Sequence, residues 1–149
     1  MQGGGTAVIA GATKSSEIYC CLVNGAYDLT GELYNGRVLF RKRGDDSLRL
    51  RFTKGGHWMV SPVANKDAND DLGYATITCS DQDQYLPPVS GWGVSDGKAV
   101  VADEGITVTL SDALKSMVRS ICCSVVVRII GPHVFPKSEH TRYQVALAK

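Results

Sequence analysis

Residues 24–60 read NGAYDLTGELYNGRVLFRKRGDDSLRLRFTKGGHWMV. They open the stretch of residues 24–101 that decides the predicted fold. The stretch is a succession of short runs that are rich in β-branched and aromatic residues and are separated by turn-forming residues. The Asn-Gly pair at residues 35–36 and the Asp-Gly pair at residues 96–97 are typical of hairpin turns, because such residues tolerate positive φ. Residues 48–52 alternate apolar and basic side chains, which is typical of a strand. The sequence therefore predicts an all-β fold, either an antiparallel meander or a small barrel.

The chain divides into three predicted regions. Residues 1–17 are predicted to be a flexible N-terminal lead, because glycines and other small residues offer little to pack. Residues 18–110 are predicted to form the β-rich module, with a first strand at residues 18–23 before a hairpin turn at Asn24-Gly25. Residues 111–149 are predicted to form one short helix and a C-terminal hairpin, and a truncated second domain is one interpretation of this region.

The short helix is the one helical signal in the chain. Either Ser111 or Asp112 is suited to be its N-cap. Leu114 and Met117 then have the spacing of an apolar helix face. The β-forming run that follows, residues 121–130, is predicted to begin the hairpin.

Length and composition indicate one globular domain. The chain has 149 residues, of which 44% are hydrophobic and 21% are charged, and such a composition is not that of a disordered chain. The formal net charge of +1 gives no long-range field, so no nucleic-acid partner is predicted. No transmembrane segment and no secretory signal are recognised. The five cysteines are an odd number, and we predict a cytoplasmic protein with buried, unpaired thiols.

Motifs for catalysis and cofactor binding are incomplete. Gly11 and Lys14 are separated by two residues, whereas in a phosphate-binding loop the lysine follows the glycine directly. Residues 61–71, a predicted surface loop, lack the glycine and the glutamate that an EF-hand needs. Adjacent cysteines do not have the spacing of zinc ligands, and nothing near Cys79 and His57 indicates an activated thiol. We therefore predict a protein that is not an enzyme and has neither a cofactor nor a metal site.

The strands predicted at residues 37–42 and 48–52 are rich in basic residues. If these strands pair, the basic side chains could form a patch that binds phosphate groups. The alternative is a solvated face whose charges protect a strand from aggregation. The anion-binding candidates are Arg37, Arg41, Arg43, Arg49 and Arg51, with Lys42 beside them.

Four aromatic residues have two interpretations. They could form a platform on which a sugar or a peptide stacks, or they could fill the core, and core packing is the favoured use. These residues are Tyr27, Tyr34, Trp58 and Trp92.

Residues 24–101 also contain a series of short motifs. They are Asn24-Gly25-x-Tyr27, Tyr34-Asn35-Gly36 before an apolar strand, Gly56-His57-Trp58, and Gly91-Trp92-x-Val94-x-Asp96-Gly97. In these motifs the stretch resembles a small β-rich module that recurs in large multidomain proteins of unicellular eukaryotes. The resemblance implies a non-catalytic scaffold or interaction role. Gly93 and Ala99 depart from the pattern, at positions where bulkier residues are expected to pack better.

A second resemblance covers residues 123–149. Val125-Val126-Val127-Arg128-Ile129, followed by Glu139-His140-Thr141-Arg142-Tyr143-Gln144-Val145, is similar to the first two strands of a PX domain. PX domains are phosphoinositide-binding modules. Their lipid-contacting segments follow these strands and have no counterpart in this chain, so the resemblance assigns no binding residue.

Two functions are therefore expected from the sequence. The first is a non-enzymatic binding or scaffold module for an unidentified protein partner, working through a sheet face or edge. The alternative is a phosphoinositide- or anionic-lipid-binding protein that uses the arginine-rich strand face.

Overall fold

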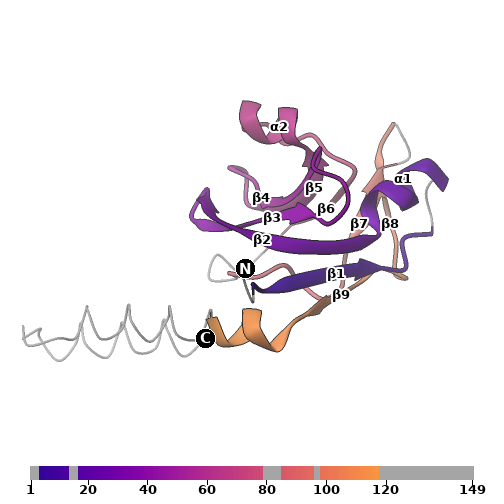
Figure 1. Cartoon of the computed structure of the whole chain (residues 1–149). Helices are drawn as coiled ribbons and strands as arrows, with labels where there is room; N and C mark the ends of the chain where they lie inside the picture. The colour runs from indigo at the N-terminus through magenta and orange to yellow at the C-terminus, as the bar shows by residue number, and fades with distance from the viewer. Residues whose placement is uncertain (1–3, 14–16, 79–84, 96–97, 118–149) are drawn as a thin grey trace, which may run out of the picture.

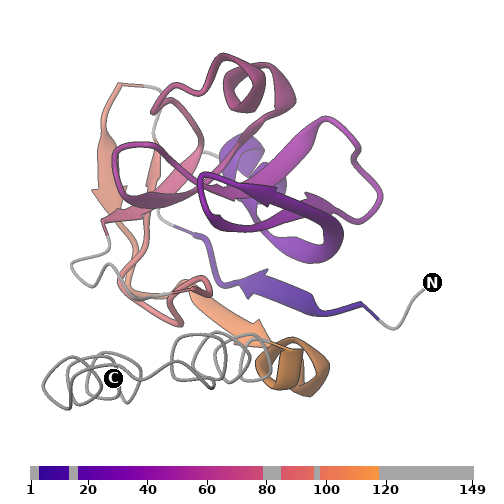
Figure 2. The same cartoon turned by 90° about the vertical axis from the view of Figure 1, so that its left-hand side faces the viewer.

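A single curled antiparallel sheet forms the body of the structure (Figures 1 and 2). The computed structural model of the chain describes residues 4–13, 17–78, 85–95 and 98–117. Within these residues the sheet has nine strands, in the order β8-β7-β6-β5-β4-β3-β2-β1-β9. All neighbouring strands are antiparallel. The predicted all-β class is confirmed.

The elements are short. The strands are β1 (Thr6–Ala10), β2 (Gly25–Tyr34), β3 (Arg37–Lys42), β4 (Leu48–Phe52), β5 (His57–Pro62), β6 (Ala75–Thr78), β7 (Gly93–Ser95), β8 (Val100–Ala102) and β9 (Thr107–Leu110). The helices are α1 (Glu17–Val23) and α2 (Val63–Ala68), and a further helical segment occupies residues 112–117. The described part of the chain thus has more helix than the one short helix that the sequence predicts, and the predicted C-terminal hairpin lies outside it.

Strands β2 to β5 form a meander in the order in which they occur in the sequence. The predicted turn between β2 and β3 is confirmed, with φ of 50° at Asn35 and 79° at Gly36. Gly44, in the turn between β3 and β4, also has a positive φ of 83°. The hairpin predicted around residues 96–97 is confirmed by the pairing of β7 with β8.

Strand β1 lies within the predicted flexible lead, and that prediction is wrong for residues 6–10. The strand pairs with β2 on one side and with β9 on the other. Ala7 and Ile9 are buried while Val8 is 40% exposed, which is the alternation of a strand with one face on a core. Small side chains offer little to pack on their own, but between two strands they fit the available space.

Helix α1 replaces the strand predicted at residues 18–23, and Asn24-Gly25 ends this helix instead of forming a hairpin turn. The backbone oxygens at the end of the helix are satisfied locally, because Asn24 N donates to Cys20 O at 2.9 Å. Lys42 Nζ donates to Leu22 O at 2.8 Å and Tyr27 Oη donates to Val23 O at 2.6 Å. These two donors lie on β2 and β3, so the helix propensity of residues 18–23 alone does not predict how the end of the helix is stabilised.

Helix α2 lies within the predicted surface loop at residues 61–71, so that prediction is wrong for residues 63–68. The helix ends at Asn69, which adopts the left-handed conformation with φ of 53°. Asparagine tolerates this conformation better than most residues. The helix lies over β4 and β5 (Figure 1).

The two faces of the sheet are buried differently. One face carries the hydrophobic core, with large side chains such as Tyr27, Phe40 and Trp58. On the opposite face, Leu39 and Met59 are buried, and this is the face that α2 covers. One face of the sheet is therefore buried by apolar packing, and the other face is covered by a short helix and the loop that follows it.

The helix predicted at residues 111–119 begins as expected. Leu114 N donates to Ser111 Oγ at 3.2 Å, which is an N-cap hydrogen bond. The same hydroxyl oxygen accepts from Thr6 N at 3.0 Å, and Leu114 is fully buried. Among the described residues no helix is long and apolar enough to span a membrane.

Two glycines with almost the same backbone conformation provide a matched stability test. Gly11 has φ of 86° and Gly31 has φ of 85°. A Cβ at Gly11 would overlap the backbone oxygen of Gly105, whereas at Gly31 it would meet nothing within 4 Å. We expect Gly11→Ala to reduce the free energy of unfolding by about 2 kcal/mol more than Gly31→Ala. Both variants strain the backbone, but only Gly11→Ala also places a methyl group against the backbone oxygen of Gly105. Urea denaturation measures the difference, and equal losses would contradict the close approach at Gly11.

Candidate functional site

Arg41 and Arg49, two of the predicted arginines, lie opposite each other on β3 and β4, and Asp28 on β2 lies opposite Arg41. Directly opposite residues leave the sheet on the same face. Arg41 Nε lies 3.6 Å from Asp46 Oδ1. Arg49 Nη1 donates to the backbone oxygen of Asp46 at 2.6 Å. The two like charges are therefore held beside the turn that precedes β4.

Arg43 makes a bidentate interaction with Asp28. Its Nε and Nη2 donate to the two carboxylate oxygens at 2.9 and 2.7 Å, and Thr6 Oγ1 donates to Asp28 Oδ1 at 2.8 Å. The hydrogen bond from Arg43 is the largest cause that lowers the pKa of Asp28 below its ordinary value. With Asp28 and Asp46 among them, the exposed arginines form a surface of mixed charge and not a purely basic patch.

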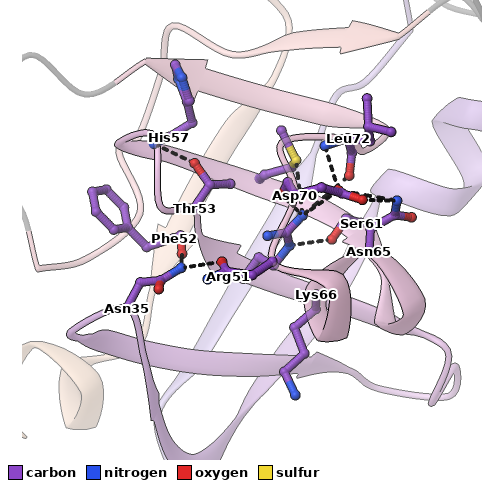
Figure 3. Close-up of polar contacts among 12 residues, drawn as sticks. Asn35, Arg51, Phe52, Thr53, His57, Ser61, Asn65, Lys66, Asp70 and Leu72 are labelled. Atoms are coloured by element: carbon purple, nitrogen blue, oxygen red, sulfur yellow. Dashed lines mark hydrogen bonds and ion pairs between the residues drawn. The ribbon is translucent and has the colours of Figure 1, made fainter.

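Arg51 lies on the same face of the sheet as Arg49, because the two residues are two positions apart on β4. It is not exposed, however, so its predicted place in a solvent-facing patch is wrong. The residue is fully buried beneath the loop that follows α2 (Figure 3). Its Nε donates to Ser61 Oγ at 2.6 Å, and its Nη2 donates to the backbone oxygen of Asp70 at 2.7 Å. Nη2 also lies 3.6 Å from Asp70 Oδ1. A buried cation needs such partners, so the residue holds the loop against the sheet.

Arg37 and Lys42 also have structural contacts. The guanidinium carbon of Arg37 lies 4.8 Å from the ring centre of Phe52 and 4.7 Å from that of Tyr85, a geometry that favours cation–π attraction. Lys42 caps α1, and its partial burial lowers the pKa of its amino group. The five candidate arginines are therefore not one patch: Arg41, Arg43 and Arg49 are at the surface, Arg37 is stacked and Arg51 is internal.

Three of the four predicted aromatic residues belong to the core. Tyr27, Trp58 and Trp92 are at most 1% exposed, so they cannot form a stacking platform at the surface. Tyr34 instead contacts α2, because its hydroxyl donates to Lys66 O at 2.5 Å. The core interpretation is confirmed for the three buried residues.

The polar residues after α2 are engaged with one another. Asn65 Nδ2 donates to the Asp70 carboxylate at 3.0 Å, and Leu72 N donates to it at 2.9 Å. The backbone hydrogen bond from Leu72 is the largest cause that lowers the pKa of Asp70. Asn35 Nδ2 donates to Asn69 Oδ1 at 3.0 Å, which ties the turn between β2 and β3 to the end of α2. These contacts stabilise the loop that covers the sheet.

Metal-ligating and thiol groups do not form a cluster in the described part of the chain. No group of three or more His, Cys, Asp or Glu residues there could hold a metal ion. Cys20 is half-buried and Cys21 is exposed, so the prediction of buried thiols is wrong for Cys21. Cys79 lies outside the described residues, as do Cys122 and Cys123.

The edge strand β8 is not among the candidate sites predicted from the sequence. It is the last strand of the sheet, paired with β7 alone, and residues 98–102 are all exposed. Val100 is 53% exposed and Val101 is 39% exposed. Exposed valines on an edge strand are unusual, because proteins commonly protect such edges with charges or proline. This edge is the strongest candidate for a binding surface.

Gly93 on β7 explains how β8 lies so close to its neighbour. A Cβ at Gly93 would lie 2.5 Å from Val100 Cγ1 and 3.1 Å from Val101 O. The expectation that a bulkier residue would pack better at this position is therefore wrong. The two valines and the Gly-Trp-Gly motif were visible in the sequence, but nothing in it indicates which strand would be at the edge.

Comparison with known proteins gives no relative. No family model matches the chain, and no curated protein or solved structure shows significant similarity to it. The resemblances to a recurring β-rich module and to a PX domain stay predictions, and the second falls on residues outside the described part.

Arg51 and Arg49, two residues apart on β4, provide a matched test of the buried network. We expect Arg51→Ala to reduce the free energy of unfolding by about 3 kcal/mol, because it removes a buried cation and leaves its partners without donors. Arg49→Ala should cost less than about 1 kcal/mol, since its contacts lie near the surface. Arg51→Met, which retains an apolar chain of similar reach, separates lost packing from lost hydrogen bonds. Equal urea midpoints for the two alanine variants would contradict the network.

Asp28 should contribute to the dependence of stability on pH. Its pKa in the folded protein is lowered from 3.8, so between the two pKa values the unfolded chain binds more protons. The stabilisation is complete above about pH 4 and is lost as the pH falls through the folded pKa. Urea midpoints at about pH 5 and about pH 3 should therefore differ less in Asp28→Asn than in the wild type. Arg43→Met should reduce the pH dependence in the same way, and an unchanged dependence in both variants would exclude this pair as a source.

Proposed function

We propose that this chain is a non-enzymatic binding module that recruits an extended segment of a protein partner to the edge of β8. The observation that carries the proposal is the run of exposed residues 98–102 at the end of the sheet. An exposed edge offers a row of main-chain donors and acceptors that another extended chain can pair with. Figure 2 shows β8 at the rim of the sheet.

The ladder between β7 and β8 identifies the groups that face outward. Asp103 N donates to Trp92 O at 3.0 Å, and hydrogen-bonded pairs alternate along an antiparallel ladder. Val101 therefore directs its main-chain groups toward Val94, its partner on β7. Val100 and Ala102 direct theirs away from the sheet. Consistent with this alternation, Ser95 N, opposite Val100, donates to Tyr74 O at 2.7 Å and not toward β8.

Side chains at the same edge add an apolar contribution. Successive residues of a strand point to opposite faces, so Val100 and Val101 present one exposed valine on each face. A partner strand would bury part of both side chains, at about 25 cal/mol per Å² of apolar surface removed from water. The edge thus combines main-chain pairing with side-chain contacts, as in binding by strand addition.

The anionic-lipid alternative has less support. Arg51 is buried, and Asp28 and Asp46 pair with two of the surface arginines, Arg43 and Arg41. A surface of mixed charge attracts a phosphate group more weakly than a purely basic one. Phosphoinositide binding stays a prediction from the sequence.

Ala102→Pro tests the edge directly. The substitution removes an outward-facing N–H, and proline is tolerated where the N–H of an edge strand faces solvent. A peptide-display selection against the wild-type protein should enrich proline-poor peptides with alternating apolar residues. We expect these peptides to bind Ala102→Pro at least about ten-fold more weakly, the loss of roughly one to two hydrogen bonds, and to bind Ala102→Ser almost normally.

Hydrogen exchange supplies the second readout. A peptide bound at this edge should slow exchange at the amides of Val100 and Ala102, because those two groups face outward. Near-ultraviolet circular dichroism confirms that Ala102→Pro is folded. Peptides that bind Ala102→Pro as tightly as the wild type, or that protect amides elsewhere, would contradict the proposal.

A further inference from the structure

We infer, on the basis of the proposed function, that the segment recruited to β8 is β8 of a second copy of this chain, paired antiparallel about Val101. Two copies would then share one continuous sheet. The inference follows from the register of the outward-facing groups, from the charges at the two ends of the strand and from a row of apolar side chains that ends at Val101.

The positions of the outward-facing groups favour this register. Hydrogen-bonded pairs form only where outward-facing residues of both strands lie opposite each other. A two-fold axis at Val101 places Val100 of each copy opposite Ala102 of the other. Both residues direct their main-chain groups outward, so each of these pairs can exchange both of its hydrogen bonds.

The charges at the ends of the strand are complementary in the same register. Lys98 precedes β8 and Glu104 follows it, and both are exposed. Each lies three positions from Val101. An antiparallel pair centred on Val101 therefore brings Lys98 of each copy to Glu104 of the other. A parallel pair would instead bring like charges together.

A row of apolar side chains crosses the sheet and ends at this edge. The cross-strand partners from β4 to β8 are, in order, Leu50, Val60, Ala75, Val94 and Val101. The first four are at most 1% exposed, whereas Val101 is 39% exposed. In the proposed pair the next member of the row is Val101 of the second copy, directly opposite, at the short spacing of a pair without hydrogen bonds. The pairing would thus continue the core across the two copies.

The other edge strand of the sheet, β9, is less accessible to a second copy. On β9 the backbone N–H of Val108 already donates to Val89 O at 2.9 Å. Val108 itself is 2% exposed. A strand added beside β9 would have to displace that segment first, so β8 is the edge at which a second copy fits.

Sedimentation-equilibrium ultracentrifugation of the full chain, over a range of concentrations in a reducing buffer, tests the pairing. The wild type should show a monomer–dimer equilibrium. Ala102→Pro should abolish it and Ala102→Ser should retain it. Lys98→Glu alone and Glu104→Lys alone should each weaken the dimer about ten-fold, because each places like charges at both ends of the paired strands.

Mixing the two charge variants distinguishes this register from other dimers. In a mixture of Lys98→Glu and Glu104→Lys, each acidic position faces a lysine, so a mixed dimer should form with about the affinity of the wild type. The double variant Lys98→Glu/Glu104→Lys should also dimerise normally. A dimer that is insensitive to Ala102→Pro or to the charge changes would overturn the inference.

Failure of the inference and failure of the proposed function are distinguishable. If the wild type is monomeric at every concentration while selected peptides still require the Ala102 N–H, the second copy is not the partner and the edge remains a binding site. If neither a dimer nor edge-dependent peptides are found, both proposals fail. Exchange protection of Val100 and Ala102 that increases with protein concentration would support self-pairing independently.

Discussion

Strand β1 is hydrogen-bonded on both sides, to β2 and to β9, and the closure of the core depends on this double pairing. Without β1, the strand β9 would have no partner in the sheet, and the buried side chains of Ile9 and Val108 would lose each other as neighbours. The end of β1 is fixed by a buried carboxylate, because Asp103 accepts from the backbone N–H groups of Thr13 at 2.7 Å and Gly105 at 3.0 Å. The N-terminal strand β1 therefore joins β9 to β2 and so to the rest of the sheet.

Most charged groups of the sheet stabilise the fold. Arg51 holds the loop after α2, Arg43 joins the turn after β3 to Asp28 on β2, and Lys42 donates to a carbonyl oxygen at the end of α1. Arg51 Nη1 is nevertheless a buried donor without a partner among the described residues, and so is Trp58 Nε1. Each such donor costs about 1–3 kcal/mol, so the remaining contacts of these two side chains must offset that cost. A basic composition on neighbouring strands is thus weak evidence for a ligand.

Main-chain groups that face outward, by contrast, occur at the edge strand β8. Strand β8 is short, exposed on both faces and flanked by charges of opposite sign. Its close approach to β7 depends on the absence of a side chain at Gly93. Because hydrogen bonding at an edge is nearly independent of side-chain identity, a partner would be selected by its charges and by the apolar residues that face each other. That selectivity is the physical basis for preferring a second copy of the same strand.

By itself the sequence determined the class of the fold, the meander from β2 to β5, the turn at Asn35-Gly36 and a helix N-cap at Ser111 or Asp112, because each depends on residues close together in the chain. The tertiary structure decided the rest. Residues 18–23 are helical because Lys42 and Tyr27 bind the carbonyl oxygens at the end of the helix, and Arg51 is internal because α2 covers it. The alternation of residues 48–52 is the same whether a basic side chain points to solvent or into a polar interior. Which strands lie at the edges is likewise a property of the whole sheet, so β8 could be recognised as an edge strand only once the pairing of all the strands was known.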